Sequence, residues 1–332
     1  MTQTKKELVQ AALNNEQVDR VPVGFWFHYL AQPEQADALG KADIAAANIA
    51  GHRAFYEKFQ PDFVKLMSDG YFLYPNETLQ KIKSAADFKN IRPLGPHHPW
   101  IEKQVELVKQ LQKNFGDEVL TFYNVFAPAR YLEWSLPIYQ KNSFSDFIAE
   151  DKEALKAGLA VLAEDLAALA ERIIKEAGAT GIYLSVQNIA DSGITQEVYR
   201  DVFEPGEKQV LAAANAASDN NILHICGYEG HHNDLNWYAT YPAKAYNWAV
   251  TVEDIALEAG KKIFGGKAVI GGFGNTQEDL LYTGTEAEIT AATVKILQNA
   301  GSTGVILGAD CTVPSDIDLK HLEWVRQAAK RF

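Results

Sequence analysis

The sequence predicts an α/β protein built as a (β/α)₈ TIM barrel, a single domain over residues 1–332 with an N-terminal helical extension. Three observations predict this fold. The 332 residues are enough for one barrel of this kind. Short β-rich runs recur eight times, and segments with apolar residues at three- and four-residue spacing follow them. No low-complexity segment or linker rich in proline and serine divides the chain.

The predicted strands are short apolar runs of the length expected for barrel strands. They are VPVGFWFH (21–28), DFVKLMSD (62–69), EVLTFYNV (118–125), GIYLSVQ (181–187), NILHIC (221–226), AYNWAV (245–250), AVIGGF (268–273) and GVILGAD (304–310). Helical periodicity covers residues 41–59, 100–115, a long double segment at 143–176, 195–217, 251–264 and 285–300, and residues 319–332 follow the last strand. That last helix would close the ring. A doubly wound open sheet is the competing arrangement.

Composition narrows the classes of function. The chain has 43 acidic and 31 basic residues, a formal charge of −12, which argues against a nucleic acid or an anionic membrane as a partner. No apolar run approaches the roughly 18 residues of a membrane span. The first helix lacks the apolar centre of a signal peptide, and two cysteines do not make a disulfide framework. We therefore expect a soluble cytoplasmic protein.

Polar side chains stand at the carboxyl ends of the predicted strands, where TIM barrels place their active sites. Asp69 ends the second predicted strand, and His28, Asn124, Gln187 and Trp248 lie at the ends of others. We expect the last four to line a substrate pocket, since strand ends that are repeatedly polar suit a ligand cavity. The alternative for each is a hydrogen bond behind the pocket wall or, for Trp248, a place in the core.

His224, Cys226 and Cys311 form the strongest pattern in the sequence. His224 and Cys226 are two residues apart on a predicted strand and would face the same side, while Cys311 follows the eighth strand. One imidazole and two thiolates at one barrel mouth suit Zn²⁺, and three protein ligands leave one position open, as in catalytic zinc sites. Buried apolar cysteines, a Cys226–Cys311 disulfide and a hydrogen-bonded strand-end histidine are the alternatives.

The chain resembles the uroporphyrinogen decarboxylase superfamily, most closely its zinc-dependent methylcobamide:thiol (coenzyme M type) methyltransferases. The resemblance rests on the stretches DRVPVGFW, FVKLMSDGY, GATGIYLSVQ, NILHICG and VILGADCTVPSDIDLKHLEWV. It implies a (β/α)₈ barrel with His224, Cys226 and Cys311 as zinc ligands. The implied reaction moves a methyl group from a methylated corrinoid, or a similar donor, to a zinc-bound substrate thiolate. Its partners would be a small thiol and a corrinoid protein.

The resemblance to this superfamily also gives a second hypothesis, the uroporphyrinogen decarboxylase reaction. In that reaction a tetrapyrrole is decarboxylated without a metal. Asp69 in MSDGY resembles the decarboxylase aspartate that contacts pyrrole N–H groups, so it is a candidate catalytic residue. The arginines that bind substrate carboxylates in that enzyme have no counterpart in FWFHYLAQPEQA, and its late histidine is missing from GADCTVP. A polycarboxylate would therefore bind poorly. A barrel that binds a corrinoid or tetrapyrrole without catalysis is the third hypothesis.

The sequence does not identify a fourth zinc ligand. Related zinc–thiol sites often add a glutamate near the end of strand six, where this chain has AYNWAV. The remaining candidates are His231, His232, Asp234 and Asp310, or the position is left to solvent and substrate.

Overall fold

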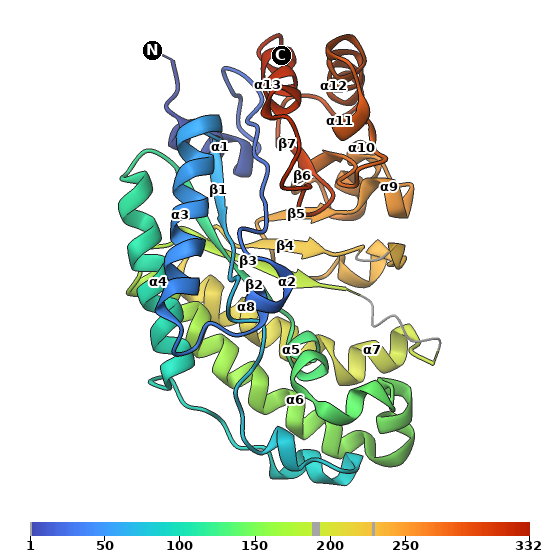
Figure 1. Ribbon diagram of the computed structural model, residues 1–332. Helices are drawn as coiled ribbons and strands as arrows, with labels where there is room; N and C mark the ends of the chain where they lie inside the picture. The colour runs from blue at the N-terminus through green and yellow to red at the C-terminus, as the bar shows by residue number, and fades with distance from the viewer. Residues whose placement is uncertain (1, 188–192, 228–229) are drawn as a thin grey trace.

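Seven parallel strands form one curved sheet in the computed structural model, which describes residues 2–187, 193–227 and 230–332. Each strand pairs with the next along the chain, in the order β1 to β7. The strands are β1 (Phe63–Leu66), β2 (Leu120–Phe126), β3 (Gly181–Val186), β4 (Ile222–Ile225), β5 (Ala245–Trp248), β6 (Ala268–Phe273) and β7 (Val305–Ala309). The sheet turns from an upright β1 to nearly horizontal β4 and β5 in Figure 1, as in a TIM-like barrel.

Helices cover the outside of the sheet, and both chain ends lie near α1 and α13 (Figure 1). The α-helices are α1 (Lys5–Leu13), α2 (Gln32–Ala36), α3 (Ala42–Phe59), α4 (Pro99–Phe115), α5 (Pro128–Ser135), α6 (Phe144–Lys175), α7 (Gln196–Val202), α8 (Glu204–Ala217), α9 (Val250–Glu253), α10 (Leu257–Ile263), α11 (Leu280–Thr283), α12 (Glu286–Ala300) and α13 (Leu319–Ala329). Short 3₁₀ turns are η1 (Leu79–Lys81), η2 (Ala85–Asn90), η3 (Pro137–Gln140) and η5 (Leu235–Tyr238).

The long double segment predicted at 143–176 is α6, whose two parts meet at a non-helical Asp151. Ser143 begins it with a capping box, in which its hydroxyl accepts from the Asp146 N–H and the Asp146 carboxylate accepts from the Ser143 N–H. The predicted helix at 195–217 is divided into α7 and α8 at Phe203, two residues before Pro205. None of the helices in the described ranges combines the length and the apolar character needed to cross a bilayer.

Strand residues alternate between the inside of the curved sheet and the helices outside it. On β1, Phe63 packs in the inner apolar cluster, whereas Val64 and Leu66 pack in the outer one. On β5, Ala245 belongs to the inner cluster and Trp248 to the outer one. This alternation decides which side chains can reach a site inside the ring.

The predicted first strand, residues 21–28, is extended but not a regular strand. It forms one parallel bridge, between Val23 and Leu307 of β7. The Val23 carbonyl accepts from the Asp62 N–H at 3.0 Å, just before β1. The segment thus lies between β7 and β1, the position of an eighth strand. The described residues form seven regular strands rather than the eight predicted, since Pro22 has no N–H to donate to a ladder.

Candidate metal centre

His224, Cys226 and Cys311 come together at the carboxyl end of the sheet. One potential ligand atom of each lies within 4.8 Å of those of the other two. His224 is on β4, where Ile222 packs in the inner cluster two residues earlier, so its imidazole faces inward. Cys226 follows β4, where its N–H donates to the Val186 carbonyl of β3 at 2.8 Å. His224 and Cys226, two residues apart in the sequence, therefore both reach the same cavity.

Asp310 fixes the loop that carries Cys311. Its carboxylate accepts from the Val250 N–H at 2.8 Å, the Thr251 N–H at 2.9 Å and the Thr251 hydroxyl at 2.5 Å. Its own N–H donates to the Phe273 carbonyl of β6 at 2.8 Å. Burial raises the pKa of the Asp310 carboxyl to about 7. These bonds tie the residue before Cys311 to β6 and α9.

The two sulfurs are placed as a pair of metal ligands would be. Cys226 Sγ and Cys311 Sγ lie 4.0 Å apart and form no disulfide, whose sulfurs would be about 2 Å apart. Two thiolates on one tetrahedral Zn²⁺, with bonds of about 2.3 Å, are separated by roughly 3.8 Å. The pKa of the Cys311 thiol lies well below its usual range, chiefly because Cys226 hydrogen-bonds to it and then because His224 and Lys65 are near. A low pKa favours the thiolate that binds metals.

The imidazole of His224 is oriented for a ligand. The Asn247 side-chain N–H group donates to the carbonyls of Ile270 at 2.9 Å and Ala309 at 3.2 Å, so its Oδ1 must face His224. That oxygen lies 2.5 Å from His224 Nδ1, which therefore carries the proton. Nε2 is left with a lone pair, and it is buried with no hydrogen-bond partner among the described residues. This orphaned acceptor and the two thiols fit a zinc ion.

No fourth protein ligand joins the group within the described part of the chain. The oxygens of Asp310 accept the bonds given above. Asp234 accepts from the Asn236 N–H at 3.0 Å, beginning η5, and His232 is exposed and 3.5 Å from Glu253. His231 is exposed as well. The fourth side of the group instead faces a cavity.

A cavity of about 440 Å³ opens from these three residues to the surface. His28, Asn124 and Gln187, which the sequence suggests as substrate-binding residues, line this cavity. Its lining in the described residues contains no carboxylate; its other polar residues are Gln32, Gln35, Lys65, Arg130, Ser185 and Thr312. Arg130, at the rim, pairs with Glu133 and lies over the Trp134 ring, 5.7 Å from its centroid.

Two predicted residues do not line this cavity. Trp248 is fully buried on the outer side of β5, where its indole N–H donates to the Ile255 carbonyl at 2.8 Å and its ring packs on Phe264. Strand alternation turns it outward, so its expected contact with substrate is not supported and it is a core aromatic. Asp69 is fully buried behind His28, accepting from its Nδ1 at 2.8 Å and from the Tyr29 N–H at 2.7 Å.

Lys65 and Asn247 are site residues that the strand-end reasoning missed. Lys65 lies in the middle of β1 and lines the cavity wall although it is 3% exposed. Burial lowers the pKa of its ammonium to about 8, against the opposing effect of the Cys311 and Cys226 thiols. A lysine inside the apolar run DFVKLM was the signal in the sequence.

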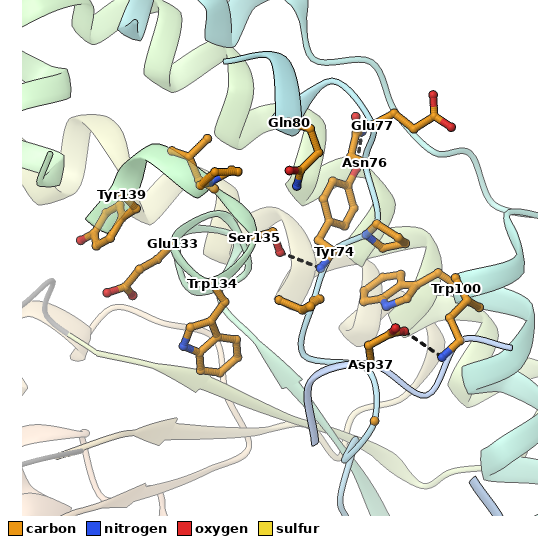
Figure 2. Close-up of a pocket in the computed structure, with 16 residues that line it drawn as sticks. Asp37, Tyr74, Asn76, Glu77, Gln80, Trp100, Glu133, Trp134, Ser135 and Tyr139 are labelled. Carbon is orange, nitrogen blue, oxygen red and sulfur yellow. Dashed lines mark hydrogen bonds between the residues drawn. The ribbon is translucent and has the colours of Figure 1, made fainter. Parts of the chain in front are cut away.

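A second cavity, of about 620 Å³, lies beside the first, with Leu73 and Trp134 in both linings. Figure 2 shows Glu133 and Trp134 on one side of it and Trp100 on the other, with the Ser135 hydroxyl accepting from the Tyr74 N–H at 2.7 Å. No histidine, cysteine, lysine or arginine among the described residues lines it. Of these two cavities, His224, Cys226 and Cys311 line only the first.

Solved structures share this fold along nearly the whole chain. A methyltransferase from Methanosarcina mazei has a TM-score of 0.68 at 16% identity, covering 99% of each chain. A B12-independent methionine synthase from Shewanella sp. W3-18-1, in complex with selenomethionine, has a TM-score of 0.60 at 11% identity, covering 94% of this chain and 97% of that one. A putative vitamin-B12 independent methionine synthase from Listeria monocytogenes scores 0.57 at 15% identity, covering 96% and 99%.

Comparison with curated protein sequences finds no significant match. The family model described as uroporphyrinogen decarboxylase (URO-D) matches residues 4–332. It spans all seven strands and the residues that meet at the candidate metal centre, and the chain therefore belongs to the uroporphyrinogen decarboxylase family.

Proposed function

We propose that this protein is a zinc-dependent methyltransferase that moves a methyl group from a corrinoid, or a similar donor, to a substrate thiolate. The observation that carries the proposal is the group of His224, Cys226 and Cys311 at the bottom of an open cavity. We further infer that residues 21–28 take the place of the eighth strand and complete a TIM barrel. The named methyltransferase and methionine synthases with similar folds are consistent with this class of reaction.

Zn²⁺ held by these residues would act as a Lewis acid that binds the substrate thiol as its thiolate, and two thiolate ligands would keep that sulfur nucleophilic. Asn247 holds the His224 ring in the tautomer that presents Nε2. Asp69 holds His28 by Nδ1, leaving Nε2 as the ring nitrogen available to the cavity and to the proton that the thiol loses. In the transfer, the new S–CH₃ bond uses a sulfur lone pair, and the donor keeps both electrons of the bond that breaks.

The cavity and its rim suit two substrates of different size. A volume of about 440 Å³ is near the lower end of the range for ligand pockets and suits a small thiol. At the rim the rings of Phe72 and Trp134 stack with centroids 5.2 Å apart, and Leu73 and Trp134 are each 38% exposed. This exposed apolar surface is suited to a flat macrocycle that presents its methyl group from outside, free or carried by a corrinoid protein.

Metal analysis of the protein purified without chelator tests the proposal. We expect about one zinc per chain, as a single site of this type holds. Cys226→Ser and Cys311→Ser should each lose most of it, whereas His321→Gln, on α13 and outside the cavity lining, should keep it. Demethylation of methylcobalamin by 2-mercaptoethanol should depend on the same two cysteines. Full metal content in both serine variants would refute the ligand assignment.

Decarboxylation of a tetrapyrrole without a metal is the second candidate, and family membership favours it. The cavity argues against it, because its one arginine in the described lining, Arg130, is paired with Glu133. Release of CO₂ from uroporphyrinogen by protein that contains no zinc would establish this reaction instead.

A further inference from the structure

A buried cation lines the same cavity as the candidate metal centre. Phe63 and Met67 pack in the inner apolar cluster, and Lys65, between them on β1, lies on the same face. Its ammonium lies over the Tyr183 ring at 4.3 Å and the Trp26 ring at 5.1 Å from the centroids. These aromatic faces hold the cation without neutralising it.

No carboxylate balances this charge at contact distance. None of the ion pairs formed by the described residues includes Lys65. Its favourable charge interactions are with Cys311, Cys226 and Asp69, in that order. A buried, unpaired ammonium is costly for folding, so its presence points to a role in the site.

The charges of the site indicate what Lys65 balances. One neutral imidazole and two thiolates match the charge of a divalent ion, so an incoming thiolate adds one negative charge that these ligands leave uncompensated. The described lining of the cavity offers the ammonium of Lys65 deep in its wall, while Arg130 at the rim is already paired with Glu133. Opposite charges several ångströms apart in a poorly solvated pocket attract strongly.

We propose that Lys65 is a positioning residue whose ammonium supplies the counter-charge for a substrate thiolate at the His224–Cys226–Cys311 site. This inference rests on the proposed function, because it assumes a metal held by these three residues. The ammonium of Lys65 would make the site selective for anionic over neutral ligands, a selectivity that the metal ligands alone do not provide.

Ligand binding to the Co²⁺-loaded protein tests this role, with the absorption bands of Co²⁺ as the signal. The probes are 2-mercaptoethanol, which binds as a thiolate, and imidazole, which binds without charge. In Lys65→Met we expect 2-mercaptoethanol to bind about 10- to 100-fold more weakly, the effect of one removed charge at an effective dielectric constant of about 20. Imidazole affinity and bound Co²⁺ should change little, and Lys65→Arg should recover most of the thiol affinity.

Lys5→Met is the matched control, because the Lys5 ammonium lies 5.1 Å from the Tyr56 ring centroid and outside the cavity lining. It should bind both probes as the unchanged protein does. Equal weakening of thiol and imidazole in Lys65→Met would show a merely structural role and overturn the inference, as would unchanged thiol affinity. If Lys65→Met does not fold, the same thiol-to-imidazole ratio in Lys65→Gln decides. An unchanged protein that holds no metal would overturn the proposed function together with this inference.

Discussion

At the scale of single residues, Asn247 decides which nitrogen of His224 faces the cavity. Its amide is fixed by two carbonyls, Ile270 on β6 and Ala309 on β7, so only its oxygen can meet the imidazole. It pairs directly with His224 in the β4–β5 register. A neighbour that fixes both tautomer and ring plane commonly strengthens metal binding by histidine.

Asn247→Ala is expected to weaken zinc binding about 10- to 100-fold while leaving the three ligands in place, because His224 loses the acceptor for its Nδ1 proton. Competition with a chromophoric chelator measures the affinity. Asn236→Ala, an exposed asparagine in η5, is the control and should bind zinc normally. Equal affinities in the two variants would mean that Asn247 does not orient the ligand.

The candidate metal ligands can be predicted from the sequence, but the residues that orient them cannot. His224 and Cys226 share a face because strand period is two, and that rule needs no tertiary information. The same rule separates Asn247, which faces inward, from Trp248, which faces α10, but it requires the strand's orientation in the sheet. Lys65 is conspicuous in the sequence as a lysine within an apolar run, but its burial inside the sheet depends on the neighbouring strands that enclose it.

At the scale of elements, a buried carboxyl joins α7, α8 and the segment after η5. Glu207 on α8 accepts from the Tyr199 hydroxyl of α7 at 2.5 Å and from the Tyr241 hydroxyl. It is 1% exposed, and burial raises its pKa to about 7 from an ordinary 4.5. The folded protein therefore keeps a proton on Glu207 that the unfolded chain releases at lower pH.

This difference predicts how stability changes with pH. Between about pH 4.5 and pH 7 the folded state binds the extra proton, so the free energy of unfolding falls as pH rises, and above pH 7 this contribution is lost. In Glu207→Gln the fall should be smaller by about 1 to 3 kcal/mol. Urea unfolding from pH 5 to pH 8 measures it, with Glu197→Gln on α7 as an exposed control. Parallel curves for Glu207→Gln and the unchanged protein would refute this assignment.

The order of strands and helices follows from periodicity alone, whereas the closure of the ring does not. All seven regular strands lie within or overlap predicted ones. Residues 21–28 have the composition of an eighth, yet their pairing depends on Pro22, which cannot donate, and on Gly24, whose N–H donates to the Leu307 carbonyl at 2.9 Å. An added Cβ on Gly24 would lie 2.2 Å from the Phe63 ring. Such close contacts are set by packing that apolar patterns do not encode.

At the scale of the whole molecule, the candidate metal centre connects distant parts of the sheet. His224 and Cys226 belong to the end of β4, and Cys311 follows β7, with β5 and β6 between them. A metal bound by all three would join these ends in the folded protein, and the unfolded chain would bind it more weakly because its ligands are not held together. Binding to the folded state alone stabilises it by mass action.

Zinc is therefore expected to raise the temperature of unfolding. At free Zn²⁺ 100-fold above its dissociation constant, the gain should be about 3 kcal/mol, which corresponds to a few degrees for a chain of this size. Calorimetry of chelator-treated protein, before and after zinc is restored, measures the shift. Cys311→Ser should show much less of it, since one of the two sulfurs 4.0 Å apart is lost. A shift of equal size in Cys311→Ser would place the stabilising zinc elsewhere on the protein.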